Sequence, residues 1–268
     1  MDVNQQAIAA MHAVTVSREY GSGGGEIAAR LARQLGWQLV DHEIVVRAAR
    51  ELEVHETAVE AHDEYVEDTL SRILNRIRYL ASEAFTLPNA GTRSDEPRLP
   101  EEMSFTALSP PTGGTRAYQE TLRYIVQAAA NTGHVVIVGR GGQVLLADRR
   151  DVLHVRVVAP LEHRVVYVAL REGLDMDTAR ARVQAKDRAR DRYMQTQYHC
   201  QHDDPHLYDL VINTAVLGLD RVVNLICLVL ESKASRLSVP VEELGPAAGL
   251  TRYAGQPADF PLPPRSSS

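Results

Sequence analysis

The chain has few cysteines, no long apolar run and no excess of basic charge. Its 268 residues include only two cysteines, Cys200 and Cys227, which are too few for a disulfide framework. No apolar stretch is long enough to span a membrane, and no hydrophobic region near the N-terminus resembles an export signal. We therefore expect a soluble, cytoplasmic protein without structural disulfides and without a membrane partner.

The charge balance also excludes a class of partner. The formal net charge is −6, whereas nucleic-acid-binding domains usually carry a clustered excess of Lys and Arg. We expect no nucleic-acid partner. The sequence leaves the oligomeric state open.

Short apolar segments alternate with stretches of helical periodicity along most of the chain. This alternation predicts a three-layer α/β/α fold around a five-stranded parallel sheet, because parallel strands are buried on both faces and need helical crossovers. The expected strands are 13–16, 37–40, 135–138, 152–158 and 210–212. The main expected helices are 26–35, 42–52, 56–85, 115–131, 143–147, 160–172, 175–194 and 219–233.

The flanks and one internal stretch differ in composition. Residues 1–12 look like a flexible leader, and 13–233 form the predicted domain. Residues 86–114 are rich in proline and glycine, which is typical of a mobile or functional loop. The prolines and terminal serines of 234–268 predict a mostly disordered tail.

The first predicted strand runs into a glycine-rich turn and then a helix. Backbone N–H groups in such a turn, together with the positive end of the helix dipole, bind phosphate. We assign this anion cradle to Gly21, Ser22, Gly23, Gly24, Gly25 and Glu26. The usual motif has Lys and Ser/Thr where this chain has Gly24 and Glu26, so the loop keeps its shape and changes its chemistry.

Two charged residues near this loop have alternative interpretations. Arg18 can replace the missing lysine on the phosphates, or it can form a structural ion pair with Glu19 or Glu26. Glu26 can complement the helix dipole in an empty site, or ligate Mg²⁺ directly or through water.

Other candidates follow predicted strands, where open α/β sheets bind ligands. Asp41 ends the second strand, and its alternative role is to cap the next helix. Arg140 lies in a Gly-Arg-Gly-Gly turn after the third strand, and its alternative is a surface charge. Arg47, on the helix after Asp41, is otherwise a solvated helical residue.

Two polar stretches near the C-terminal end of the predicted domain remain. The basic run 180–192 is either a solvated helix face or a lid that closes cations over phosphate; for the lid we single out Asp187, Arg188 and Arg190. The histidines around Cys200 lack the spacing of a zinc motif, so we predict no metal site there.

Four blocks together resemble the cytidylate kinase-like family of phosphate-loop nucleoside monophosphate kinases. They are Ser-Arg-Glu-Tyr-Gly-Ser-Gly-Gly at 17–24, Leu-Gly-Trp-Gln-Leu-Val-Asp at 35–41 followed by Arg47, Gly-Arg-Gly at 139–141, and Tyr-Asp-Leu-Val-Ile-Asn-Thr at 208–214. The resemblance implies phosphoryl transfer from ATP, with Mg²⁺, to CMP, dCMP or a related nucleotide. It also implies an acceptor-binding insert at about 42–131 and a lid at about 175–206.

The resemblance gives roles to the acceptor-side residues. It implies that Asp41 and Arg47 contact the acceptor nucleotide and that Arg140 holds its phosphate. This chain departs from the family pattern at Arg18 for Gly, Gly24 for Lys, Glu26 for Ser/Thr, Gly141 for Asp, and Arg190 for the second lid Asp.

The sequence thus supports two functions of different classes. The first is a nucleotide kinase, with the acceptor phosphate attacking in line and needing no strong base because it is already anionic. The second is a catalytically weak or inactive nucleotide-binding module for regulation or interaction. A kinase for a different small acceptor is a further variant of the first.

Overall fold

A five-stranded, all-parallel sheet forms the centre of the computed structural model, which describes residues 5–41 and 115–245. The strand order is β2-β3-β1-β4-β5, which confirms the predicted sheet. The strands are β1 (Ala13–Arg18), β2 (Gln38–Val40), β3 (Val135–Val138), β4 (Val152–Val158) and β5 (Leu210–Asn213).

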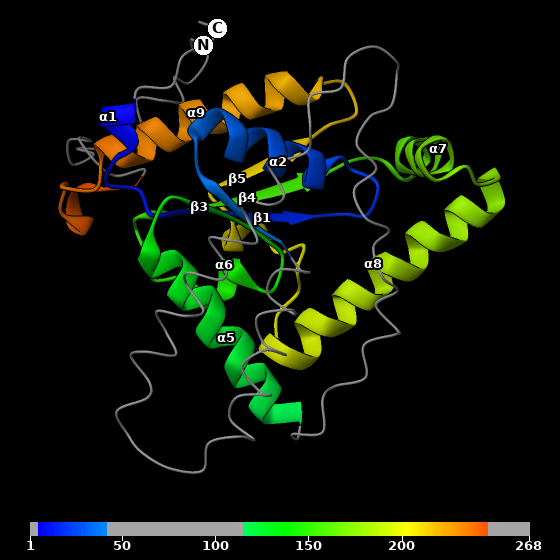
Figure 1. Ribbon diagram of the computed structural model, residues 1–268, viewed down its shortest axis with the longest axis horizontal. Helices are drawn as coiled ribbons and strands as arrows, with labels where there is room; N and C mark the ends of the chain where they lie inside the picture. The colour runs from blue at the N-terminus through cyan, green and yellow to red at the C-terminus, as the bar shows by residue number, and fades with distance from the viewer. Residues whose placement is uncertain (1–4, 42–114, 246–268) are drawn as a thin grey trace, which may run out of the picture.

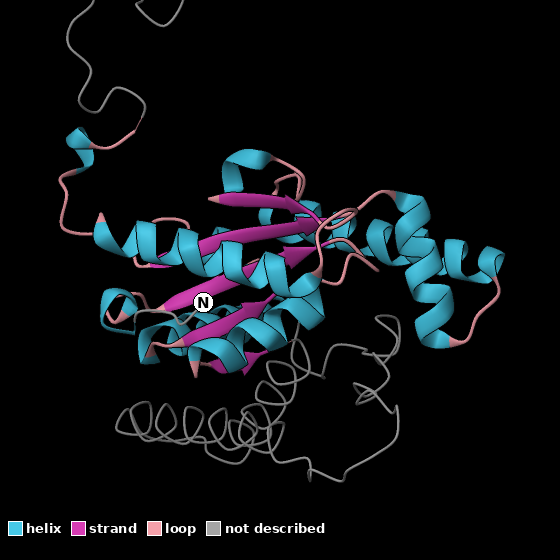
Figure 2. Ribbon diagram, turned by 90° about the horizontal axis from the view of Figure 1, so that it is seen from above, coloured by secondary structure: helices cyan, strands magenta, loops and turns pink. Residues whose placement is uncertain are grey.

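The strands end together on one side of the molecule. Val16 of β1 is in register with Val138 of β3 and with Val155 of β4. All strands therefore run in one direction, toward the side where the chain turns into its glycine loop, as Figure 2 shows. This common edge is where an open parallel sheet binds ligands.

Helices cover both faces of the sheet (Figure 1). On one face lie α1 (Gln5–Ile8), α2 (Gly24–Leu35) and α9 (Leu219–Ser235). The spacing of Ile27, Leu31 and Leu35 places them on one side of α2, where they join the buried core with β1 and β4. Gly36, with φ +67°, ends this helix in the left-handed conformation that glycine favours.

The other face is covered by α5 (Thr115–Thr132) and α6 (Gly142–Leu145). Ile125 and Ala129 of α5 pack with Val135 and Ile137 of β3 in a second core. The C-terminal half of α5 is therefore a layer of the central domain, although its residues fall in the range 42–131 that we expected to be an insert. The rest of that range, 42–114, lies outside the described residues.

Beyond the carboxyl ends of the strands lie α7 (Leu161–Glu172) and α8 (Met176–Tyr198), at the right of Figure 1. Asp175 caps α8 by accepting a hydrogen bond from the Thr178 N–H at 2.9 Å. The helix continues four residues past Met194, its predicted end. Two short 3₁₀ turns, Pro205–Leu207 and Val241–Glu243, complete the described structure.

The flanks pack more closely than their composition suggests. Ile8 and Met11 are fully buried, so part of the segment expected to be a flexible leader belongs to the core. After α9, Leu237 packs against the same core, and Arg150 donates hydrogen bonds to the carbonyls of Arg236 and Val239. Within the described residues, no helix is long and apolar enough to cross a bilayer.

Candidate functional site

The glycine loop between β1 and α2 depends on residues without side chains. Gly21 and Gly23 have φ of +81° and +80°, a backbone conformation that glycine adopts without strain. A Cβ atom on Gly21 would lie 2.9 Å from the carbonyl oxygen of Arg164, and one on Gly23 would lie 2.9 Å from Leu219. Close packing on both sides thus holds the loop in its shape.

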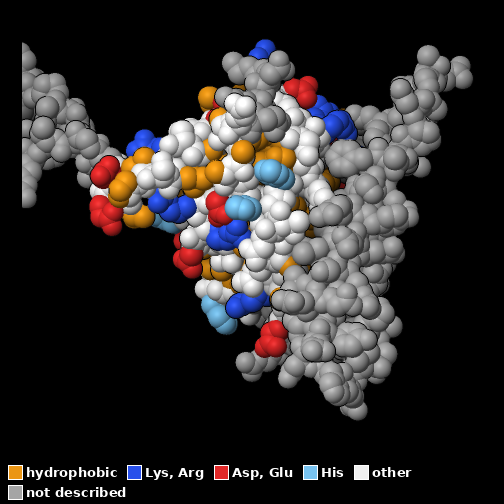
Figure 3. Space-filling view, turned by 60° about the vertical axis from the view of Figure 1, so that its left-hand side comes forward, with side chains coloured by type: hydrophobic (Ala, Val, Ile, Leu, Met, Phe, Trp, Pro, Cys, Tyr) orange, Lys and Arg blue, Asp and Glu red, His pale blue; other side chains and the backbone are white. Residues whose placement is uncertain are grey.

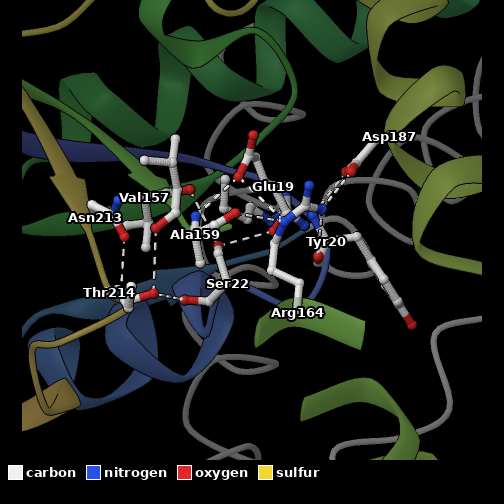
Figure 4. A network of polar contacts seen from close by, with 12 residues as sticks. Glu19, Tyr20, Ser22, Val157, Ala159, Arg164, Asp187, Asn213 and Thr214 are labelled. Carbon is white, nitrogen blue, oxygen red and sulfur yellow. Dashed lines mark hydrogen bonds and ion pairs between the residues drawn. The ribbon is translucent and has the colours of Figure 1, made fainter. Parts of the chain in front are cut away.

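Ser22 anchors the loop to the sheet. Its hydroxyl, which is buried, donates to the carbonyl of Glu19 at 2.9 Å and lies 3.2 Å from that of Val157. Its own carbonyl accepts a hydrogen bond from the hydroxyl of Thr214 at 2.9 Å, as Figure 4 shows. Because the Ser22 side chain is committed to the fold, only its backbone remains to act on a ligand.

Arg18 explains why position 24 holds glycine. A Cβ atom on Gly24 would lie 2.5 Å from Cβ of Arg18, far inside van der Waals contact. The Arg18 side chain then extends toward the end of β3, where a Cβ atom on Gly139 would lie 2.5 Å from its Nη1. Arg18 therefore fills the space that a larger residue at position 24 would need, and its charge lies beside the Gly139–Arg140 turn.

Helix α8 is tied to the glycine loop through Asp187. One carboxylate oxygen of Asp187 accepts a hydrogen bond from the backbone N–H of Tyr20 at 2.9 Å. The other lies 2.5 Å from Nη1 of Arg164, which also donates to the Tyr20 carbonyl at 3.0 Å (Figure 4). The loop, α7 and α8 thus meet at one ion pair, and that pair is partly shielded from solvent.

Arg164 and Glu19 complete this junction. Arg164 is 7% exposed, and its Nε donates to the carbonyl of Ala159 at 2.9 Å. Glu19 accepts a hydrogen bond from the Ala159 N–H at 2.9 Å and lies 3.4 Å from Nε of Arg164. The buried guanidinium is therefore matched by two carboxylates, as a buried charge requires.

The basic run of α8 divides between two roles. Arg180 and Arg182 form ion pairs with Glu162 and Glu172 of α7. Arg190 instead turns toward the loop: its Nη1 donates to the carbonyl of Arg18 at 3.4 Å, and its Cζ lies 5.4 Å from the Tyr20 ring centroid. Of the three residues proposed for a lid, Asp187 and Arg190 contact the loop, while Arg188 is exposed on α8.

The turn after β3 has an unusual backbone. Gly139, Arg140 and Gly141 have φ of +76°, +58° and +68°, so a non-glycine residue is held in the left-handed region between two glycines. Such strain is kept where surrounding contacts impose it. Here the Tyr198 hydroxyl donates to the Arg140 carbonyl at 2.9 Å, and the Tyr198 ring occupies the space that a Cβ on Gly141 would need.

Two of the three predicted acceptor residues, Arg140 and Asp41, follow neighbouring strands at the same edge of the sheet. The Arg140 guanidinium lies 5.5 Å from the ring centroid of Tyr193 on α8. Asp41 follows β2, whose Val40 is in register with Ile137, so it lies one strand away from the Gly139 turn. Arg47 lies outside the described residues, and its role stays a prediction.

Glu26 lies in the first turn of α2 and is paired there. Its Oε1 is 2.8 Å from Nε of Arg30, which also binds Asp220 at 2.7 Å. The two side chains of the Glu26–Arg30 pair are 30% and 31% exposed, and exposed pairs spaced four residues apart contribute only about 0.3–0.5 kcal/mol. If a cation binds nearby, Glu26 can therefore exchange Arg30 for that cation at a small cost in free energy.

The histidine-rich segment after α8 is arranged as separate pairs. Nδ1 of His202 lies 2.5 Å from Asp191, and Nδ1 of His206 lies 2.8 Å from Asp204. No group of three or more potential metal ligands occurs in the described part of the chain. Burial raises the pKa of the Cys200 thiol, which does not favour a reactive thiolate.

The sequence did not single out Arg164, Tyr20 or Tyr198, although each holds part of this site. Arg164 gave no local signal, because its partners are 23 or more positions away in the chain or belong to a backbone. Tyr20 stands inside the glycine motif and was a visible candidate. Burial raises the pKa of Tyr198, so its hydroxyl stays protonated and keeps donating to the Arg140 turn.

The opposite edge of the sheet differs in character. Figure 3 views the molecule from the side where the strands begin, and acidic, basic and histidine side chains are interspersed there. Asp151 binds both His12 at 2.5 Å and Arg149 at 2.6 Å, and Lys233 binds Asp209 at 2.6 Å. Because these charges neutralise one another, the edge with the glycine loop is the better candidate for an anionic ligand.

Fold and site together define a three-layer α/β protein with a glycine-rich loop between its central strand and the following helix. A sequence model of the cytidylate kinase-like family matches residues 13–216. That range is more than half of the chain, and the chain therefore belongs to the cytidylate kinase-like family. This confirms the resemblance seen in the sequence.

Individual relatives are distant. The cytidylate kinase of Methanopyrus kandleri is 31% identical over 106 residues, which are 37% of this chain and 55% of that protein. A uronate isomerase of Corynebacterium glutamicum is 28% identical over 126 residues, which are 47% of this chain and 24% of that protein. The chain thus spans about half of the first protein's length and about a quarter of the second's.

A solved structure supports the fold. An uncharacterized protein from Eubacterium ventriosum superimposes with a TM-score of 0.56 at 19% identity, over 83% of this chain and 99% of that one. At this identity the likeness shows the fold alone.

Proposed function

We propose that this protein transfers the γ-phosphoryl group of MgATP to CMP, dCMP or a related nucleoside monophosphate in the cytoplasm. The observation that carries the proposal is the convergence of cationic side chains from separate segments on the glycine-loop edge. Arg18 comes from β1, Arg140 from the turn after β3, and Arg190 from α8. Phosphoryl transfer depends mainly on positioning and charge neutralisation, which such a set of arginines supplies.

The glycine loop would bind the donor phosphates. Backbone N–H groups of Gly21–Gly25 would face the anion at the start of α2, where the helix dipole favours negative charge. Arg18 extends across this edge in the absence of the usual lysine, and Arg190 reaches the loop from the other side. Both would act on phosphate oxygens, with Asp187 keeping α8 in place.

The chemistry that a magnesium ion would supply here is the neutralisation of phosphate charge. Glu26 is the residue that would hold it, directly or through water, because its carboxylate is a hard oxygen donor in the first turn of α2. Exchanging Arg30 for a cation costs Glu26 little, since their pair is partly exposed.

The acceptor would lie between Asp41, Arg47 and Arg140. Support for Arg140 comes from its contacts: the Tyr198 hydroxyl donates to its carbonyl, and its guanidinium lies over the Tyr193 ring. A fixed cation would hold the acceptor phosphate for in-line attack.

A second function, that of a nucleotide-binding module with little or no turnover, is favoured by one contact. Asp187 accepts the Tyr20 N–H, so a carboxylate already uses a loop donor that could face a phosphate. Gly24 in place of the usual lysine also favours a module with little or no turnover.

Turnover and binding assays separate the two. Purified protein is incubated with MgATP and CMP, dCMP, UMP, AMP or GMP, and diphosphates are measured by chromatography alongside calorimetry with each nucleotide. We expect cytidine diphosphates to form. Binding without any diphosphate would support the module, and absence of both binding and turnover would contradict both functions.

A further inference from the structure

A second buried arginine lies in the sheet itself. Arg156 belongs to β4, in register with Ser17 of β1 and Val211 of β5, and is 4% exposed. Its neighbours Val155 and Val157 point into the core shared with α2 and α9. Because side chains alternate along a strand, Arg156 faces the opposite side of the sheet.

Arg156 contrasts with Arg164, the other buried arginine near the site. Arg164 binds two carboxylates and two carbonyls. Within residues 5–41 and 115–245, Arg156 forms no ion pair, and its fully buried Nη1 has no hydrogen-bond partner. Its Cζ lies 5.7 Å from the centroid of the Tyr208 ring. Burial, and after it the charge of Arg156, lower the pKa of nearby His202.

An unpaired buried guanidinium is costly. Removing a charge from water is unfavourable, and a protein offsets this only through a counter-charge or full hydrogen bonding. Contact with an aromatic ring offsets only part of it. A buried guanidinium without a counter-charge is suited to bind an anionic ligand.

The surroundings of Arg156 are polar and lie beside the acceptor edge. The Tyr208 hydroxyl donates to the His202 carbonyl at 2.6 Å and lies 3.1 Å from Oγ of Ser17. Nε2 of Gln143 lies 3.4 Å from the same hydroxyl. Gln143 is on α6, which begins directly after the strained Gly139–Gly141 turn.

The C-terminal half of α8 covers this region. Met194 contacts Gln143, and Asp191 binds His202. The next residue after Ser17 is Arg18, which belongs to the glycine-loop edge. Arg156 therefore lies near the loop, the Arg140 turn and the helix that docks on the loop.

We propose that Arg156 forms an anion-binding subsite within the sheet and takes the phosphate of the acceptor nucleotide from the side facing Arg140. That the anion is the phosphate of an acceptor nucleotide rests on the proposed kinase function. The guanidinium supplies the counter-charge and the fork of donors that phosphate binds, and phosphate relieves the unpaired charge. Because Arg156 lies near the glycine loop, an acceptor phosphate bound to it would lie beside the phosphates of the donor nucleotide.

The test uses two substitutions of Arg156 and a matched control. Arg156→Met removes the charge at similar length, Arg156→Lys keeps the charge without the fork, and Arg236→Met removes an exposed charge at the far end of α9. Thermal unfolding of the full chain is followed with and without inorganic phosphate, and KM values for CMP and ATP are measured in parallel.

Without ligand, we expect Arg156→Met to melt at the same temperature as the unmodified protein or higher, because an unpaired buried charge has been removed. The stabilisation by phosphate should fall, and the KM for CMP should rise about tenfold to hundredfold while that for ATP stays unchanged. For Arg156→Lys, the stabilisation by phosphate and the KM for CMP should lie between those of the unmodified protein and those of Arg156→Met. Arg236→Met should behave as the unmodified chain.

Several outcomes overturn the subsite. The first is an unchanged stabilisation by phosphate in Arg156→Met, which would mean that phosphate binds at the glycine loop instead. The second is an unchanged KM for CMP in both Arg156 variants. If Arg156→Met does not fold, an unchanged phosphate response and KM for CMP in Arg156→Lys overturn it. A phosphate response that depends on Arg156, in a protein that makes no diphosphate, would refute the kinase proposal and leave the subsite standing.

Discussion

Adding one methyl group at adjacent positions of the glycine loop should have opposite effects on stability. Gly24 and Gly25 are consecutive residues in the first turn of α2. A Cβ on Gly24 would lie 2.5 Å from Cβ of Arg18 and 3.4 Å from Cβ of Val157, whereas a Cβ on Gly25 would meet nothing within 4 Å. Replacing each glycine by alanine therefore isolates the contact with Arg18.

The magnitudes decide the sign at each position. Alanine in a helix is favoured over glycine by about 0.5–1 kcal/mol. Gly25→Ala should raise the free energy of unfolding by up to this amount. At Gly24, the contact with Arg18 is about 1 Å too short, and overpacking of this kind costs about 1–3 kcal/mol. Gly24→Ala should therefore destabilise by about 1–2 kcal/mol net.

Arg18 supplies the second half of the experiment. In an Arg18→Gly background the obstructing Cβ is absent, so Gly24→Ala should lose most of its cost and show a coupling energy of about 1–2 kcal/mol. The same background should accept lysine at position 24, as in the usual loop. Urea unfolding of the four variants of this cycle, with Gly25→Ala as the control, measures the effect.

Equal effects of alanine at positions 24 and 25 would refute this reasoning. So would a destabilisation by Gly24→Ala that persists unchanged without the Arg18 side chain. Either result would mean that Arg18 does not determine why glycine stands in the lysine position.

Three further outcomes can be checked on the same protein. Gly141→Ala should destabilise by at least about 1 kcal/mol, because it adds a side chain at positive φ against the Tyr198 ring; an unchanged urea midpoint would contradict this. Arg164→Met should cost about 3 kcal/mol, because Asp187 and Glu19 lose the buried counter-charge that they share, and protease cleavage in α8 should accelerate; a rate equal to that of the unmodified chain would show that the pair does not hold the helix. Burial lowers the pKa of His154 in the folded state, so stability present above the unfolded pKa of about 6.5 is lost as pH falls toward the folded value; His154→Gln should flatten this dependence, and an unaltered slope would argue against it.

The elements and their order could be predicted because they depend on local signals. Apolar runs such as 135–138 and 152–158 gave the parallel strands, and the spacing of Ile27, Leu31 and Leu35 gave the buried side of α2. The errors were at the flanks, where Ile8 and Met11 are buried although the leader around them is polar. Two apolar residues in a short segment do not form a period, so only the core shows where they pack.

Part of the candidate site could be predicted from the sequence. Strand–turn–helix order placed the glycine loop, Asp41 and Arg140 on one edge, because parallel strands end together. The roles of those residues, and of Arg18, Arg188, Arg190 and Asp187, stay predictions. Arg164 and Arg156 escaped notice because an arginine within a helix or strand looks the same whether it is buried or exposed.

By itself, the sequence determined the family, the parallel sheet and the order of strand, glycine turn and helix, all of which follow from residue order and short-range pattern. Only the tertiary structure decided why the loop departs from its usual form. Arg18 fills the space beside Gly24, and the Tyr198 ring fills the space beside Gly141. Arg190 reaches the loop from 172 residues away in the chain, at the position of the missing lid carboxylate. Such contacts depend on which side chains meet across the fold, and no local pattern encodes them.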